Sequence, residues 1–220
     1  AGEGYRYLLK SIAAGDTGRD LATLLTRYYS AAGTPPGFWV GNGLAGLEDP
    51  VLAEGGVVTE DQLRHLLGRG EHPVTGEQLG RAYFAFKPLR ERVKIRTAKL
   101  SEALNADQRE AAVEQIVAEE KQRKRPRTVA GFDYTFSVPK SVSVLWAVSD
   151  GGTQALIGQA HHAAIREVID LLERDVAATR TGANGVAQVD VRGVIATAFD
   201  HFDSRAGDPQ LHTHVVIANR

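Results

Sequence analysis

Twenty residues at the carboxyl end organise this chain: His201-Phe-Asp-Ser-Arg-Ala-Gly-Asp-Pro-Gln-Leu-His212-Thr-His214-Val-Val-Ile-Ala-Asn-Arg220. The β-branched residues that follow His214 predict a strand through this segment. Because successive strand side chains point to opposite faces of a sheet, His212 and His214 are expected on the same face. Two imidazoles therefore point in the same direction.

A second strand is predicted upstream at Val194–Phe199, and it ends at His201. The residues between the two strands, 203–209, are rich in aspartate, glycine and proline, which favour turns. A β-hairpin is therefore expected. It would place His201 beside the other two histidines, with three imidazoles on one face of the sheet.

Three neutral imidazoles form a suitable site for a divalent transition ion. They leave coordination positions open, which a metal that acts as a Lewis acid requires. The alternative is three unrelated histidines with structural or surface roles. A His-x-His pair opposite a third histidine favours the metal site. The chain has no cysteine, which excludes disulfides and thiolate ligands.

Residues 129–138 alternate between apolar and polar side chains, which predicts a half-buried strand with one polar face. Asp133 lies on the polar face with Thr135 and Ser137. Aspartate is unfavourable in a strand, so we expect Asp133 to have a partner such as a cation, a hydroxyl or a histidine N–H. Pro139 suits the first turn of a helix over residues 140–148.

Further helices are predicted from the spacing of apolar residues. They cover residues 4–14, 19–32, 59–67, 101–122 and 153–178. Thr59 and Gln62 fit a capping box at the third of these helices. His161 and His162 lie on the last one and are interpreted as ordinary helix residues. Loops are expected at 34–43 and 179–185, and a short strand at 83–86.

Residues 87–127 form a basic helical segment that we interpret as an insertion within a single domain, 1–220. Six lysines and arginines lie between positions 87 and 99, and a second basic run covers 121–127. Glutamates are interleaved, so one interpretation is a solvated helix face. The other is an arm that follows a phosphate backbone.

The composition limits the function classes. The 220 residues carry a formal net charge of −1, so any binding to nucleic acid must use local basic surfaces. We find no membrane segment and no signal peptide, and we expect a cytoplasmic location. Methionine is absent even at position 1. We therefore expect an excerpt of a longer protein, with a domain incomplete at both ends.

Four of the six tyrosines lie near the amino terminus: Tyr5, Tyr7, Tyr28 and Tyr29. A phenol is a weak nucleophile until its anion is stabilised, and a metal that polarises a phosphodiester lowers the barrier. Attack on phosphorus would give a phosphotyrosine ester. The ester conserves the bond energy, so cutting could be followed by rejoining. The alternative for these tyrosines is packing or an amphipathic surface.

Four segments carry a family resemblance. They are Gly131-Phe-Asp133-Tyr-Thr-Phe-Ser-Val-Pro-Lys140-Ser-Val-Ser, the segment from His201 to His214, Tyr28-Tyr29 followed by Gly33 and Trp39-Val-Gly41-Asn-Gly43, and Glu173-Arg174 leading to Thr179-Arg180-x-Gly182. Together they resemble the conjugative relaxases of the TrwC/TraI (MobF) type, members of the HUH endonuclease superfamily. The resemblance spans nearly the whole chain.

The resemblance implies an α/β (α+β) fold with a palm-like central antiparallel sheet flanked by helices. It implies that His201, His212 and His214 bind a divalent metal, for which we expect Mg²⁺ or Mn²⁺, with Zn²⁺ or another transition ion as the alternative. It also implies an acidic residue, Asp133, beside the nucleophile and the metal. Asp133 would orient a histidine ligand or accept the phenolic proton. Lys140 and Arg180 become candidate DNA phosphate contacts.

The implied activity is site- and strand-specific nicking of single-stranded DNA at the transfer origin of a bacterial plasmid or integrative element. The products would be a 5′-phosphotyrosine link and a free 3′-hydroxyl, followed by strand transfer in conjugation. Accessory transfer proteins and a fused carboxyl-terminal helicase are possible partners. The location would be the bacterial cytoplasm.

The tyrosines depart from the family pattern. Family members usually carry two tyrosine clusters, and here Tyr5-Arg6-Tyr7 replaces the earlier adjacent pair. We favour Tyr7 or Tyr5 for the first cut and Tyr28, next to Tyr29, for a second transfer. Three alternatives remain open: a DNA-binding module that has lost cleavage, a metallo-hydrolase that acts through bound water, and a rolling-circle replication initiator of the same superfamily.

Overall fold

The structure, a computed structural model, describes residues 35–83, 86–124 and 128–220. The helices predicted at 4–14 and 19–32, with the four amino-terminal tyrosines, lie outside the described residues. The chain divides into two compact units. Unit 1 comprises Ala1–Ala82 and Val129–Arg220, and unit 2 comprises Tyr83–Thr128. The insertion predicted at 87–127 falls within unit 2.

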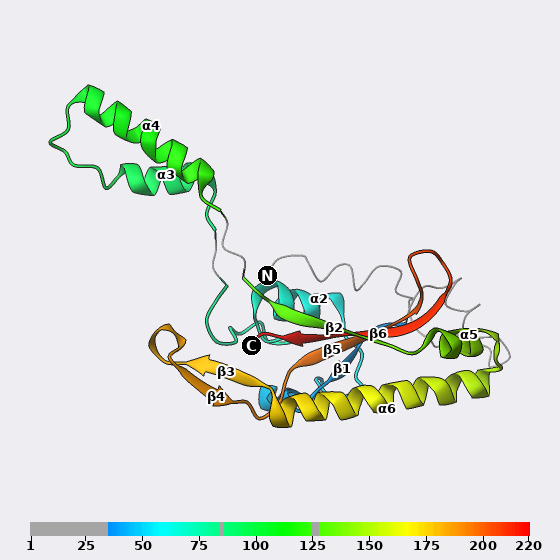
Figure 1. Cartoon of the computed structure of the whole chain (residues 1–220). Coiled ribbons are helices and arrows are strands. Elements are labelled where there is room, and N and C mark those ends of the chain that lie inside the picture. The colour runs from blue at the N-terminus through cyan, green and yellow to red at the C-terminus, as the bar shows by residue number, and fades with distance from the viewer. Residues whose placement is uncertain (1–34, 84–85, 125–127) are drawn as a thin grey trace. The chain divides into compact units, whose positions relative to one another are not determined.

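A four-stranded antiparallel sheet forms the centre of unit 1 (Figure 1). Its strands are β1 (Phe38–Val40), β5 (Ala196–Asp203), β6 (Pro209–Ala218) and β2 (Gly131–Ser137), in that spatial order. Every neighbouring pair is antiparallel. The mixed helix and antiparallel-sheet fold predicted from the sequence is therefore confirmed.

The β5–β6 hairpin is the centre of the sheet. His201 pairs with His212 and Phe199 pairs with His214, so the predicted hairpin is confirmed, with His201 beside the other two histidines. Strand β5 begins two residues later than predicted and continues to Asp203, beyond His201. The register shifts between His201 and Asp203, where the pairing is irregular.

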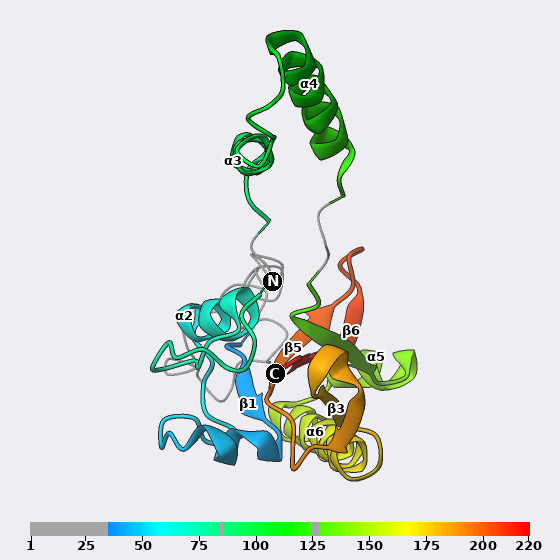
Figure 2. The same cartoon turned by 90° about the vertical axis from the view of Figure 1, so that its left-hand side faces the viewer.

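One face of the sheet, which we call the imidazole face, carries the three histidines. Its apolar part is covered by the segment that follows β1, with η2 (Asn42–Leu47), α2 (Glu60–Leu63) and η3 (Arg64–Arg69). Figure 2 shows α2 on the opposite side of the sheet from α6. The core on this side is built from buried apolar residues of both layers: Trp39, Leu44, Leu52, Val58, Leu63, Leu66, Leu67, Ile195, Phe199, Val216 and Ala218.

Helix α2 begins at its predicted cap. The Thr59 side chain accepts from the backbone N–H of Gln62, and the Gln62 side chain accepts from the backbone N–H of Thr59. This is the capping box expected from the sequence. The helix is continued by the π-helical turn of η3 to Arg69, two residues beyond the predicted end, and Gly70 terminates it in a left-handed conformation.

The other face, which we call the helix face, is covered by α5 (Lys140–Val148) and α6 (Gly151–Asp175) (Figure 1). Helix α5 has its predicted bounds, with Pro139 as the N-cap residue. Helix α6 begins two residues before the predicted start, because Asp150 caps the backbone N–H groups of Gly152 and Thr153. The core here comprises Val40, Ile165, Ile169, Ala196, Ala198, Val215 and Ile217.

The loop predicted at 34–43 is wrong in its centre, because Phe38–Val40 forms edge strand β1. Trp39 is fully buried on the imidazole face. The glycines after it allow close backbone approach: Gly41 has φ +99°, and a Cβ on Gly43 would collide with the backbone of Val194. The segment therefore serves packing.

The loop predicted at 179–185 is wrong in its first three residues, which belong to a strand, and correct for 182–185, which connect two strands. It belongs to a two-stranded ribbon of β3 (Ala178–Thr181) and β4 (Ala187–Asp190), joined by η4 (Ala183–Gly185). The turn-forming residues at 182–185 led us to predict a loop, and the two short strands beside them were missed.

Unit 2 is a pair of helices, α3 (Leu89–Thr97) and α4 (Ala106–Gln122). The helix predicted from residue 101 begins later, because Asn105 and Gln108 form a capping box at its true start. Tyr83 and Phe86 lie outside any strand, and the two residues between them are outside the described chain. Among the described helices, none is long and apolar enough to cross a membrane.

Candidate metal centre

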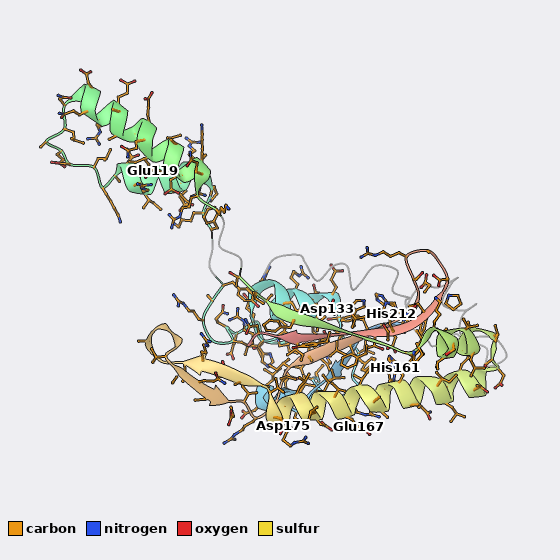
Figure 3. All side chains as sticks on the ribbon, viewed as in Figure 1. Glu119, Asp133, His161, Glu167, Asp175 and His212 are labelled. Carbon is orange, nitrogen blue, oxygen red and sulfur yellow. The ribbon has the colours of Figure 1, made fainter. Side chains whose placement is uncertain are left out.

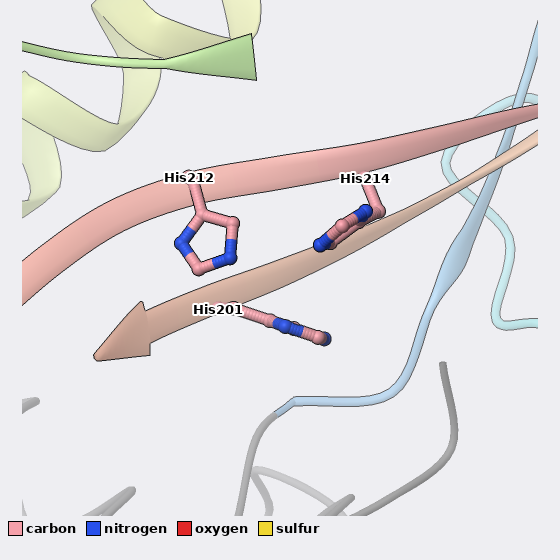
Figure 4. A group of neighbouring side chains, drawn as sticks. All are labelled: His201, His212 and His214. Atoms are coloured by element: carbon pink, nitrogen blue, oxygen red, sulfur yellow. The ribbon is translucent and has the colours of Figure 1, made fainter. Parts of the chain in front are cut away.

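The three histidines of the imidazole face lie together. The ring centroids are 5.2 Å apart for His201 and His212, 5.0 Å for His201 and His214, and 5.3 Å for His212 and His214. Each ring offers one nitrogen, and these nitrogens lie within 4.8 Å of one another. Figure 4 shows the rings gathered between β5 and β6. The proximity predicted from the hairpin is confirmed.

Strand β2 fixes the ring of His214. Its Nδ1 lies 3.0 and 3.1 Å from the two carboxylate oxygens of Asp133 and 3.3 Å from Oγ1 of Thr135. A carboxylate only accepts, so Nδ1 carries the hydrogen and Nε2 keeps its lone pair. The expectation that Asp133 has a partner, with a histidine N–H among the options, is confirmed.

A backbone carbonyl fixes the ring of His212. Its Nδ1 lies 2.8 Å from the carbonyl oxygen of Gln210. A carbonyl oxygen only accepts, so Nδ1–H donates and Nε2 is again left with a lone pair. Two of the three imidazoles are thus held in the same tautomer, with the same nitrogen available for a ligand.

The third ring, His201, has a buried polar atom without a partner. Among the described residues, Nε2 of His201 has no hydrogen-bond partner although it is shielded from solvent. Burial, and then the neighbouring His214 and His212, lower the pKa of His201 to about 4. His201 is therefore a neutral imidazole at neutral pH. A buried nitrogen without a partner usually has one in the functional state.

These residues fit a divalent ion on the chemistry of their donors. Two rings have fixed tautomers with Nε2 available, and the third is neutral with a nitrogen lacking a partner. Three neutral nitrogen ligands suit several divalent ions and leave further positions for oxygen ligands. Asp133 and Thr135 both lie within hydrogen-bond distance of Nδ1 of His214, and metal ligands are commonly oriented by such bonds.

The helix face carries a second polar cluster, directly behind the first. The Thr213 hydroxyl donates to Asp200 over 2.6 Å, and Nε2 of His161 lies 2.9 Å from that hydroxyl. Since the hydroxyl hydrogen is already used, Nε2–H of His161 must donate to it. Nε2 of His162 approaches both oxygens of Asp200, at 3.1 and 2.9 Å.

The sequence did not predict this cluster, because we interpreted His161 and His162 as ordinary helix residues. They lie on α6 as predicted, and Figure 3 labels His161 there. His161 is buried, and both histidines form hydrogen bonds to strand residues. A signal was available: His161 precedes the buried Ile165 and Ile169 by four and eight residues, so it belongs to the buried stripe of the helix.

Lys140 and Arg180, the candidate phosphate contacts, have different surroundings. Lys140 forms an ion pair with Asp208 and donates to the carbonyl of Pro209 over 2.7 Å, so it ties α5 to the β5–β6 loop. Arg180 is exposed on β3 and lines a groove of about 850 Å³. Arg81, Arg192 and Arg220 line the same groove.

Glu173 joins its own segment of the resemblance to the one that contains Asn42. Its carboxylate accepts from the backbone N–H of Asn42 over 2.8 Å, from the Asn42 side chain over 2.5 Å, and from the backbone N–H of Val194 over 2.8 Å. It thereby holds α6 against the loop after β1 and the start of β5. This part of the motif has a structural role.

The tyrosines proposed as nucleophiles, Tyr5, Tyr7, Tyr28 and Tyr29, lie outside the described residues. Within the described residues, the structure places the histidine cluster and Asp133 together.

Comparison with known proteins adds to this geometry. A family model described as TrwC relaxase matches residues 1–220. Two curated proteins, both named Multifunctional conjugation protein TraI, are similar: one from Escherichia coli at 43% identity over 90 residues, and one from Escherichia coli strain K12 at 41% over 98 residues. The matches cover 40% and 44% of this chain but only 5% of each relative.

The fold is also similar to that of a solved structure. It is described as the conjugative relaxase TrwC in complex with oriT DNA in a copper-bound form. The TM-score is 0.53 and the sequence identity is 26%, and the match covers 87% of this chain and 49% of that one.

Proposed function

Because the chain belongs to the TrwC relaxase family, we propose that it is the DNA-nicking and strand-transfer part of a conjugative relaxase. Its substrate is single-stranded DNA at the transfer origin of a plasmid or integrative element. The observation that carries the proposal is the set of three imidazoles beside Asp133 on one sheet face. The related proteins, a conjugation protein and a relaxase in complex with oriT DNA, support the substrate class.

His201, His212 and His214 are the proposed metal ligands, with Mg²⁺ or Mn²⁺ as the expected ion. The copper-bound form of the related relaxase structure supports a divalent site without identifying the natural metal. A bound divalent ion acts as a Lewis acid that polarises the phosphodiester and makes its phosphorus more electrophilic.

The proposed nucleophile is an amino-terminal tyrosine, Tyr7 or Tyr5 for the first cut and Tyr28 or Tyr29 for the second transfer. The phenolic oxygen forms a bond to phosphorus, and the bond from phosphorus to the 3′ oxygen breaks. The phenol loses its proton to a base and the departing 3′ oxygen takes one up. The products are a 5′-phosphotyrosine and a 3′-hydroxyl, and the reverse reaction joins a new strand.

Asp133 has two proposed roles that its position supports. Its hydrogen bond to His214 orients a ligand ring, and its carboxylate can accept the phenolic proton. Arg180 remains a proposed phosphate contact because it is exposed in an arginine-lined groove. Lys140 is a weaker candidate, since a phosphate would have to replace the carboxylate of Asp208.

The direct test incubates the natural full-length protein with a single-stranded transfer-origin oligonucleotide and Mn²⁺ or Mg²⁺. A covalent protein–DNA adduct is expected, and it should be lost in His212→Ala and when the four tyrosines are changed to Phe. His65→Gln is the matched control, because this partly buried imidazole pairs with Glu71 away from the cluster. An adduct that survives the tyrosine changes contradicts the proposal.

The same experiment separates the alternatives. Binding of DNA without any adduct would identify a module that has lost cleavage. Hydrolysis that survives the tyrosine changes but not His212→Ala would identify a metallo-hydrolase that acts through water. Cleavage of a replication origin in preference to a transfer origin would identify a rolling-circle initiator.

A further inference from the structure

Unit 2 has a charge opposite to that of the rest of the chain. Residues 83–128 hold 12 lysines and arginines against 7 aspartates and glutamates, a formal charge of +5. The other residues hold 14 against 20, a formal charge of −6. The overall value of −1 therefore conceals a basic unit joined to an acidic one.

Part of this positive charge stabilises the helix pair itself. Glu120 of α4 is only 1% exposed, and Nε of Arg92 donates to it over 2.8 Å. Arg96 lies 3.2 Å and Arg123 3.5 Å from the same carboxylate. The hydrogen bond from Arg92, above all, holds the pKa of Glu120 below its ordinary value. These arginines are structural and already paired.

The remaining cations of α3 point elsewhere. Arg90 and Lys94 are each two residues before the paired Arg92 and Arg96, so they lie about 200° away around the helix. They are four residues apart and therefore neighbours on one exposed face. Neither forms an ion pair with a described carboxylate.

Unit 2 carries three further exposed cations: Lys99 after α3, Lys121 in the last turn of α4, and Lys124 two residues beyond that helix. They too have no ion pair with any carboxylate that the structure describes. Asp107 is the acidic residue in the first turn of α4, where the helix dipole stabilises it. We call Arg90, Lys94, Lys99, Lys121 and Lys124 the unpaired cation set.

We infer that the unpaired cation set is a second DNA-binding site, which binds the phosphate backbone outside the cleavage centre. Glu119 and Glu120 pair with the inner arginines, and the cations of the set form no ion pair with a described carboxylate, as expected of a surface that binds a polyanion. The identity of that polyanion as DNA rests on the proposed function. The backbone of a single strand and that of a duplex stem offer the same chemistry.

The test measures DNA affinity of the full-length protein against salt concentration. Changing Arg90, Lys94 and Lys99 to Gln keeps helix propensity and removes three charges. The slope of log affinity against log salt is expected to fall by about 2 to 3, and affinity near 0.1 M salt by about tenfold or more. Lys121→Gln with Lys124→Gln is an independent variant, with an expected fall in slope of about 1.5 to 2.

The matched control is Glu110→Gln with Glu114→Gln, which changes exposed charges of the same helix and should not weaken binding. Single-stranded DNA and a hairpin duplex of equal length are tested in parallel. If the salt slope falls for only one of the two DNAs, unit 2 binds the backbone of that DNA. If it falls for both, unit 2 binds either backbone without preference. Unchanged slopes for both basic variants on both DNAs would overturn the inference.

Failure of this inference can be told apart from failure of the proposed function. His212→Ala should abolish the covalent adduct and leave the salt slope due to unit 2 unchanged. The basic variants should still form the adduct on a short oligonucleotide at low salt.

Discussion

Nδ1 of His214 donates to the carboxylate of Asp133 from the neighbouring strand, at 3.0 Å from Oδ1. This contact selects the tautomer that leaves Nε2 of His214 available. Asp133→Ala should therefore weaken affinity for Mn²⁺ by about 10- to 100-fold. Titration calorimetry measures this loss, and the exposed Asp190→Ala serves as the control. Equal affinity in the Asp133 and Asp190 variants would contradict the orienting role.

Burial and two neighbouring imidazoles lower the pKa of His201 to about 4, from an ordinary value of 6.5. The unfolded chain therefore binds a proton at a higher pH than the folded one. Without metal, the free energy of unfolding should fall as pH drops from 6.5 to 4, and His201→Asn should reduce that fall. Urea unfolding at several pH values measures it, and NMR titration of the ring gives its pKa directly. A ring that titrates near 6.5 would contradict the prediction.

Two buried threonines of the sheet offer a matched pair. The Thr213 hydroxyl joins His161 to Asp200, whereas the Thr197 hydroxyl has no hydrogen-bond partner among the described residues. Thr213→Val leaves buried polar groups unpaired and should cost about 1–3 kcal/mol, while Thr197→Val should be neutral or stabilising. Urea unfolding compares the two variants, with Thr213→Ser expected to retain most of the stability. A similar loss for both valines would contradict the network.

His162 should contribute stability with the opposite pH dependence to His201. The hydrogen bond to Asp200 raises its pKa above 6.5, against opposing effects of burial and of Arg166. The stability that His162 contributes is fully present below pH 6.5. It is lost as the pH rises through the pKa of His162 in the folded state. Burial lowers the pKa of the adjacent His161, which acts in the other direction. His162→Asn should remove the loss of stability that occurs as the pH rises above 6.5, and His161→Gln should leave that loss in place.

The sequence correctly predicted those helices and strands for which turn formers, caps and residue propensities all favour the same structure. The β-branched run after His214 and the turn formers before Pro209 specified the hairpin, and the hairpin brought the three imidazoles together. Pro139 and Thr59 specified helix starts because the local chemistry of a cap acts within one turn.

The errors arose where distant residues decide the structure. Trp39 is in a strand because β5 pairs with it, and no local pattern records that pairing. The cluster of His161 and Asp200 depends on how α6 crosses the sheet, which sequence spacing does not fix. The unfavourable position of Asp133 in a strand predicted that it has a partner. The register of β2 against β6 shows that this partner is His214.

Adjacent glutamates of α4 test how unit 2 is held together. Glu120 is 1% exposed with three arginines around it, whereas Glu119 has a side chain 44% exposed and pairs with Arg96 alone (Figure 3). Glu120→Ala leaves the largely buried Arg92 without its carboxylate and should destabilise the helix pair.

Glu119→Ala removes a solvent-exposed ion pair and should change the stability of the helix pair much less. Hydrogen exchange separates the two cases, because amides of Leu89–Thr97 should lose protection in Glu120→Ala and keep it in Glu119→Ala. The β5–β6 amides report on unit 1 and should be unchanged in both. Equal protection of α3 in the two variants would mean that the buried carboxylate does not hold the pair, and that apolar contacts such as those of Ile116 do so instead.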